Sequence, residues 1–107
     1  MLSESSIELE KLCMVSDAVI MDTDAHSIEI DRWSPKAITK TKPIYISENA
    51  WIGSKSAVLK GVTIGKNSVV GLGTIVRQKV PENVVVIGNP QQTVSYTHLT
   101  LPTILRV

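Results

Sequence analysis

His26 is the histidine that stands among other residues capable of chemistry, at the end of the segment Asp22-Thr-Asp-Ala-His26. A histidine has a pKa near neutrality, so it can take the proton of a hydroxyl that attacks a carbonyl carbon. A backbone carbonyl or a nearby carboxylate (Asp22, Asp24 or Glu29) could fix its tautomer, and the sequence does not choose among them. A lone histidine is more often structural than catalytic. The elements around it therefore decide how it is interpreted.

A six-residue period begins at Ile46 and continues to Val76. The first position is always Ile or Val, at Ile46, Ile52, Val58, Ile64, Val70 and Val76. The fifth is always small or β-branched, at Ala50, Ser56, Val62, Ser68 and Thr74. Neither an α-helix nor a half-buried strand has this period, so the chain must turn once per repeat. Short strands joined by tight corners satisfy it, with three hexads to one triangular coil and the leading aliphatic side chain pointing inward.

The front of the chain carries a weaker repeat in another frame. Leading aliphatic residues are expected at Leu9, Val15 and Met21, and fifth positions at Cys13, Val19 and Ala25. The step from Met21 to Ile46 is not a multiple of six, so residues 27–43, which are polar and basic, are expected to leave the coil as a functional loop. Residues 84–87 read as a final strand, and Gly88-Asn89-Pro90 as a closing turn.

These patterns predict an all-β fold, a parallel β-helix with one protruding loop, and a single domain over residues 1–93. Residues 94–103 resemble a translation of sequencing-adapter DNA, so residues 94–107 are expected to be an artefactual tail in which His98 carries no chemistry. The true C-terminus beyond Val94 is left open.

Composition excludes several classes of protein. Cys13 is the single cysteine, which rules out a disulfide framework and a cysteine-based zinc site. No apolar run approaches the length of a membrane span, so a cytoplasmic location is the default expectation. Residues 1–31 hold eight acids and one base, whereas residues 32–79 hold nine bases and one acid. Such a basic half suits a polyanion such as coenzyme A, or simply solvated corners. The basic residues follow coil corners and lack stacking aromatics, which argues against nucleic-acid binding.

The hexads, the Asp22–His26 motif, the segment Trp51-Ile-Gly-Ser54 and the segment 84–90 together resemble the hexapeptide-repeat acyltransferases of the sugar O-acetyltransferase type (galactoside, maltose and surface polysaccharide). The resemblance implies a left-handed β-helix that assembles as a homotrimer, with acyl-CoA sites between subunits, so that a monomer would be inactive. It further implies transfer of an acetyl group from acetyl-CoA to a hydroxyl of a sugar or polysaccharide, without a metal. The acceptor, and whether the acyl group is longer than acetyl, are left open.

The same resemblance assigns roles to residues. His26 matches the general base, and Asp24, Arg32 and Trp33 are expected to contact the acceptor. The residues expected to bind the cofactor are Trp51, Ser54, Gly71, Leu72 and Arg77. Trp51 could equally pack on a neighbouring subunit, and Leu72 stands where alanine is common, so it could narrow the pantetheine slot. Gln92 replaces a basic residue that usually meets the 3′-phosphate of coenzyme A.

Two alternatives accompany this prediction. A γ-class carbonic anhydrase shares the fold, but it needs three zinc-binding histidines, and the chain has one outside the expected tail. The other alternative is an incomplete structural β-helix without activity, since family members usually carry more N-terminal sequence. Trimerisation and coenzyme A binding separate it from the enzyme.

Overall fold

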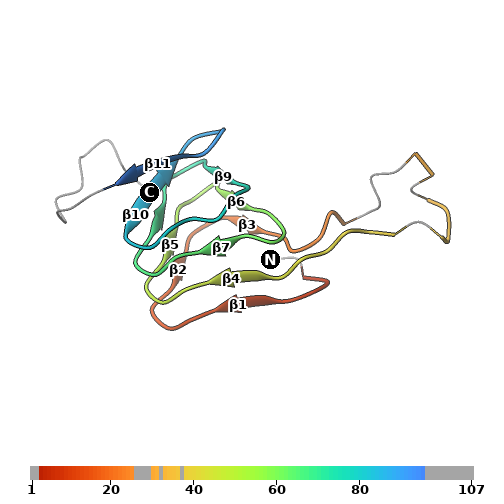
Figure 1. Ribbon diagram of the computed structural model, residues 1–107, viewed down its shortest axis with the longest axis horizontal. Coiled ribbons are helices and arrows are strands. Elements are labelled where there is room, and N and C mark those ends of the chain that lie inside the picture. The colour runs from red at the N-terminus through yellow and green to blue at the C-terminus, as the bar shows by residue number, and fades with distance from the viewer. Residues whose placement is uncertain (1–2, 26–29, 32, 37, 96–107) are drawn as a thin grey trace.

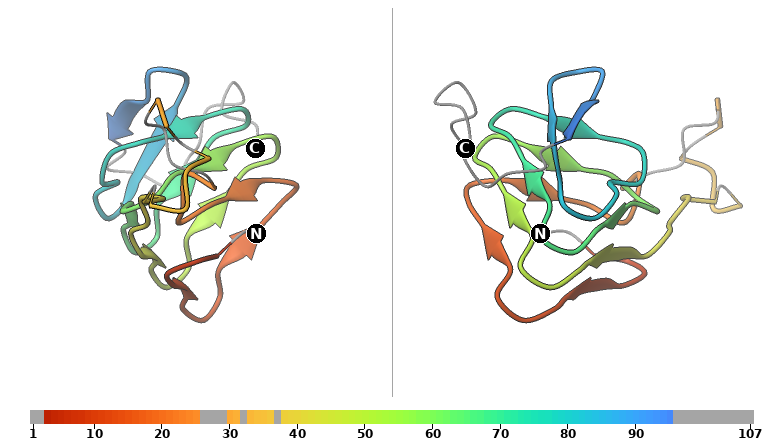
Figure 2. Two further views of the ribbon diagram at one scale, coloured as in Figure 1. Left: turned by 90° about the vertical axis from the view of Figure 1, so that its right-hand side faces the viewer. Right: turned by 60° about the vertical axis from the view of Figure 1, so that its left-hand side comes forward.

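The computed structural model of the chain describes residues 3–25, 30–31, 33–36 and 38–95. Within these residues the fold contains no helix, and its short strands form three sheets that enclose one core (Figure 1). The chain climbs from β1 at one end to β11 at the other, and successive coils lie on top of one another (Figure 1). Viewed from other sides, the coils have a triangular outline from one corner of which the loop departs (Figure 2).

Each sheet is one face of the triangle, and it takes one strand from each coil. The first face contains β1 (Ile7–Leu9), β4 (Ile44–Ile46) and β7 (Thr63–Ile64). The second contains β2 (Met14–Val15), β5 (Trp51–Ile52), β8 (Val69–Val70), β10 (Val84–Ile87) and β11 (Gln92–Ser95). The third contains β3 (Val19–Ile20), β6 (Ala57–Val58) and β9 (Ile75–Val76). Strands of successive coils pair in parallel, and among the named strands only β10 and β11 pair antiparallel. The all-β, parallel β-helix expected from the sequence is thereby confirmed.

The six-residue period corresponds to the core. All six leading aliphatic residues from Ile46 to Val76 have side chains with 0% exposure. The fifth positions are also buried, with Ala50, Ser56 and Val62 at 1% and Ser68 and Thr74 at 0%. Register explains this, because Ile46 pairs with Ile64 and Ile52 with Val70, so equivalent side chains stack directly between coils. The buried hydroxyls of Ser56 and Thr74 both donate to the carbonyl of Gly71, which removes the cost of burying them.

The prediction of which first-coil residues occupy the leading position of the six-residue repeat is wrong by one residue on the third face. Leu9 and Val15 pair with Ile46 and Ile52 as expected, but Ile20, and not Met21, pairs with Val58. Ile20 is fully buried, whereas Val19, expected as a fifth position, faces outward with 51% exposure. The corner before β3 is one residue shorter than the corresponding corner before β6. Such a deletion changes the inward phase of everything after it, as one-residue shifts in a strand do.

Three corners connect the faces, and the names used below refer to them. The asparagine corner comprises residues 10–13, 47–50, 65–68 and 81–83. The glycine corner comprises residues 16–18, 53–56, 71–74 and 88–91. The loop corner comprises the described residues of the segment 21–43, together with residues 59–62 and 77–79. The loop expected at residues 27–43 therefore leaves the first coil at the loop corner, and its described part projects from the body of the helix (Figure 1).

The upper end is closed by the hairpin of β10 and β11, whose two strands are joined by the turn at residues 88–91. Val94 and Ser95, the first residues of the expected tail, lie in β11, and residues 96–107 lie outside the described part of the chain. No helix among the described residues is long and apolar enough to cross a membrane.

Candidate active site

The loop begins at Asp22, whose side chain is completely buried. Its carboxylate accepts hydrogen bonds from the N–H groups of Glu4 and Ser5, both at 2.7 Å, and from the hydroxyl of Ser3 at 2.9 Å. Desolvation acts to raise the pKa of Asp22, but these three donors outweigh it and hold the pKa below its ordinary value. The Asp22 carbonyl in turn accepts the N–H of Lys42, on the returning side of the loop. Asp22 thus ties the start of the chain to both ends of the loop.

Thr23 fixes the next turn of the backbone. It pairs in an antiparallel bridge with Thr41, and its hydroxyl donates to a carboxylate oxygen of Glu4 at 2.8 Å. The same hydroxyl oxygen accepts the N–H of Ala25 at 3.0 Å. Ala25 has a φ of +67°, a left-handed conformation that costs a residue with a Cβ about 1–2 kcal/mol. The Thr23 hydroxyl stabilises that conformation immediately before His26.

Asp24 points across to the second coil. Its N–H donates to the Lys40 carbonyl, and its Oδ1 lies 2.5 Å from Nζ of Lys60. The two side chains are only 18% and 28% exposed. The other oxygen, Oδ2, is buried and has no hydrogen-bond partner among the described residues. Asp24 therefore has one carboxylate oxygen in an ion pair and one buried acceptor oxygen whose hydrogen-bonding capacity is unused.

The remaining residues expected at the loop are only partly described. His26 and Arg32 lie outside the described residues. Trp33 lies on the projecting loop with 74% exposure, and Ile30 and Ile38 of the same loop are 98% and 75% exposed. The loop thus carries three large apolar side chains into the solvent. Such side chains are suited to cover a ligand or a second molecule.

Three of the five residues expected to bind the cofactor meet at the glycine corner. The N–H of Gly73 donates to the Ser54 carbonyl at 3.0 Å, which places Ser54 directly beneath the turn that holds Gly71 and Leu72. Coils approach so closely here that a Cβ added to Gly53 would lie 2.7 Å from the Val70 carbonyl oxygen. Leu72 is 59% exposed and points away from the core. The corner is a nearly bare backbone surface with one apolar side chain beside it.

Trp51 lies on the outward side of β5, next to the buried Ile52. Its indole Nε1 is buried and has no partner among the described residues. Trp51 pairs in register with Met14 below and Val69 above, so its ring belongs to an apolar column along the second face. That placement fits both roles expected for it, contact with a cofactor and contact with another subunit.

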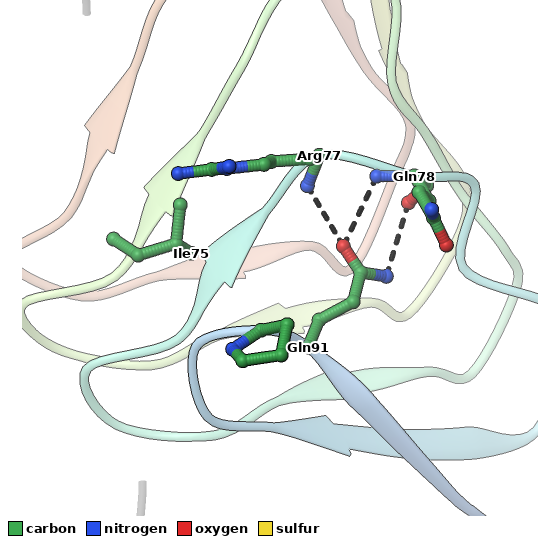
Figure 3. A pocket seen from close by; sticks show the side chains of 5 residues that line it. Ile75, Arg77, Gln78 and Gln91 are labelled. Atoms are coloured by element: carbon green, nitrogen blue, oxygen red, sulfur yellow. Dashed lines mark hydrogen bonds between the residues drawn. The ribbon is translucent and has the colours of Figure 1, made fainter.

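Arg77 lies at the loop corner of the last coil, directly after β9. A small cavity of about 80 Å³ adjoins it, lined by Ile75, Arg77, Gln78, Pro90 and Gln91 (Figure 3). The Gln91 side chain closes one wall: its Oε1 accepts the N–H groups of Arg77 and Gln78 at 2.7 and 3.0 Å, and its Nε2 donates to the Gln78 carbonyl. The Arg77 guanidinium extends over Ile75 (Figure 3).

Two residues of this region were missed from the sequence. Lys60 occupies an ordinary hexad position, and no sequence signal links it to Asp24. Gln91 follows the Gly88-Asn89-Pro90 turn, where a side chain that caps the preceding coil could have been expected. Among the described residues, no cluster of histidine, cysteine and carboxylate side chains could hold a metal ion.

The sequence of the chain is similar to sequences of known proteins. The model of the bacterial transferase hexapeptide family (six repeats) matches residues 43–78. Galactoside O-acetyltransferase from Lactococcus lactis is 42% identical over 77 residues, which make up 72% of this chain and 37% of that protein.

Solved structures agree. The polySia-specific acetyltransferase NeuO has a TM-score of 0.74 at 32% identity, over 91% of this chain and 45% of its own. A galactoside acetyltransferase in complex with coenzyme A has a TM-score of 0.71 at 30% identity, over 85% and 48%. The left-handed β-helix and the resemblance expected from the sequence are confirmed. The chain spans less than half the length of each of these proteins.

Proposed function

We propose that this chain, which belongs to the hexapeptide-repeat family of the sugar O-acetyltransferase type, takes part in transfer of an acetyl group from acetyl-CoA to a sugar hydroxyl. The observation that carries the proposal is that interactions hold the first residues of the loop in place. Three consecutive residues, Asp22 to Asp24, are fixed by hydrogen bonds and an ion pair directly before His26. Such preorganisation is what a general base needs.

In the proposed reaction, His26 takes the proton of the acceptor hydroxyl while the hydroxyl oxygen attacks the carbonyl carbon of the thioester. The C–S bond then breaks, and the proton passes from the imidazolium to the leaving thiolate, so that charge is balanced. Asp24 supplies a hydrogen-bond acceptor for the sugar, and Arg32 and Trp33 are its further proposed contacts. The role of each residue is inferred from the family resemblance together with its position on the chain.

For the donor, the bare backbone of the glycine corner provides an extended surface on which a pantetheine arm could lie beside Leu72. Trp51 flanks this surface from β5, and Arg77 offers a cation at the far end for a phosphate. A galactoside acetyltransferase of similar fold was solved with coenzyme A. We propose acetyl-CoA as the donor on this basis.

A trimer is supported by the outward side chains of the three faces. On the second face the outward column is apolar, with Met14, Trp51 and Val69 in register. On the third face it is Val19, Ala57 and Ile75. The first face instead presents Glu8, Tyr45 and Thr63. Apolar columns on two adjacent faces fit a second copy, and the polar face fits solvent.

The test is an assay of acetyl transfer to a galactoside, in which the released thiol of coenzyme A is measured. The wild-type chain is compared with His26→Ala. We expect the turnover number to fall by about 10²–10⁴-fold, the usual contribution of a general base, while calorimetry shows acetyl-CoA binding unchanged. His98→Ala, in the expected tail, is the matched control and should keep full activity. Equal activity in His26→Ala would refute the proposed role. Light scattering on the same samples should give the mass of a trimer.

A further inference from the structure

The Asp24 carboxylate is held at one oxygen and left open at the other. Nζ of Lys60 lies 2.5 Å from Oδ1, whereas Oδ2 is buried without a partner among the described residues. A buried carboxylate oxygen without a donor is destabilising, so folded proteins rarely leave one unless something else supplies the donor. A donor group of a bound ligand would satisfy Oδ2.

The direction in which Oδ2 points is not free to change. The backbone of Asp24 is fixed because its N–H donates to Lys40, and because Asp22 and Thr23 are both tied down beside it. The side chain is then fixed by Lys60, which comes from the second coil, after β6. An ionised carboxylate offers acceptor positions only, so Oδ2 fits an O–H or N–H group and repels an anion.

We propose that Lys60 is a positioning residue that holds Asp24 with Oδ2 presented to a hydroxyl of an uncharged acceptor sugar. This rests on the proposed acetyltransferase function and narrows its acceptor class. Lys60 acts through Asp24 and does not itself contact the acceptor. The uncharged galactosides are thereby favoured over acidic sugars of the polysialic type, although the chain resembles acetyltransferases associated with both.

The experiment is a double-mutant cycle in the full chain, with Lys60→Met, Asp24→Asn and the double variant. Methyl galactoside, maltose and oligosialic acid are the probes. We expect each single variant to raise KM for methyl galactoside about tenfold with KM for acetyl-CoA unchanged, and the double variant to be no worse than either single one. Lys60→Arg, which keeps the charge, should recover part of the loss.

The matched control is another lysine–carboxylate pair between coils, Lys66 with Glu48, at 3.8 Å in the asparagine corner. Lys66→Met and Glu48→Gln should leave every KM unchanged. Thermal unfolding of all variants reports whether a loss comes from misfolding instead.

Sugar binding measured by saturation-transfer NMR separates this inference from the proposed function. Binding of methyl galactoside that is weakened in Lys60→Met, without acetyl transfer by the wild-type chain, would support the inference and overturn the proposed function. Additive effects in the cycle, a preference for oligosialic acid that depends on Lys60 but not on Asp24, or no binding of any probe would each overturn the inference.

Discussion

The asparagine corner and the loop corner belong to the same coils but hold them together differently. At the asparagine corner, Asn49 donates to Asn67 and Asn67 donates to Asn83, and each has a φ close to +60°. At the loop corner, the corresponding connection runs through a buried aspartate, a threonine hydroxyl and one ion pair. The asparagine corner uses asparagine in three successive coils, and this set of residues is called the asparagine ladder below. The loop corner uses a different residue for each of its contacts.

The difference teaches where chemistry can be placed in a repeat protein. In a ladder of identical residues, each side chain bonds to its equivalent in the next coil, so the coils themselves supply its hydrogen-bond partners. The loop corner breaks the repeat, and only there does a buried carboxylate oxygen remain unpaired among the described residues. Interruption of the repeat is thus what leaves a buried acceptor oxygen without a partner among the described residues.

The largest loss of stability should come from adding a methyl group between two coils at the asparagine corner. A Cβ added to Gly65 would lie 2.5 Å from the backbone of Pro81 and Glu82, which cannot move without breaking the coil above. We expect Gly65→Ala to lower the free energy of unfolding by about 3 kcal/mol, the upper range for overpacking. Urea unfolding measures it.

Gly61→Ala in the loop corner is the comparison for that variant. Its added Cβ would meet only the side chain of Lys42, at 3.1 Å, which can rotate away. The φ of +79° remains unfavourable for alanine, so we expect a loss of about 1 kcal/mol. Equal losses in the two variants would show that the corners are equally rigid, and would contradict the contrast drawn here.

The next prediction concerns how the stability contributed by Asp22, in the loop corner, depends on pH. The pKa of Asp22 is lower in the folded chain than its ordinary value near 3.8, because hydrogen bonds from Glu4, Ser5 and Ser3 outweigh desolvation. Its stabilisation is therefore complete above that ordinary value and is lost as the pH falls through the folded pKa. We expect Asp22→Asn to be less stable than wild type at neutral pH and equally stable in acid, measured by urea unfolding across the acid range. Glu82→Gln, at an exposed carboxylate, serves as the control.

The smallest effect should extend the asparagine ladder by one coil. Leu12 occupies the ladder position of the first coil with a φ of +64° and 72% exposure. Asparagine tolerates this conformation better than leucine does and could donate to Asn49. We expect Leu12→Asn to raise the free energy of unfolding by about 0.5–1 kcal/mol, seen as a higher thermal midpoint. Leu12→Ala, without the amide, should not reproduce the gain.

The sequence predicted the regular part of the molecule well because one rule repeats there. Inward stacking requires an aliphatic residue at each coil, and the leading residues from Ile46 to Val76 show it directly. The rule fails at Ile20, because the corner before β3 lacks one residue and a deletion leaves no mark in composition. The cofactor residues Ser54, Gly71 and Leu72 were named together from the family motif, and the structure brings them together at one corner, while their role stays a prediction.

By itself, the sequence determined the coil and its three faces, because both follow from a period that must be kept to bury apolar side chains. Only the tertiary structure decided which polar groups meet: Glu4 with Thr23, Lys60 with Asp24, and Gln91 with the backbone of Arg77. These partners lie on different coils or at distant places in the chain. Their contacts depend on how coils stack and corners turn, and no local pattern of residues encodes that.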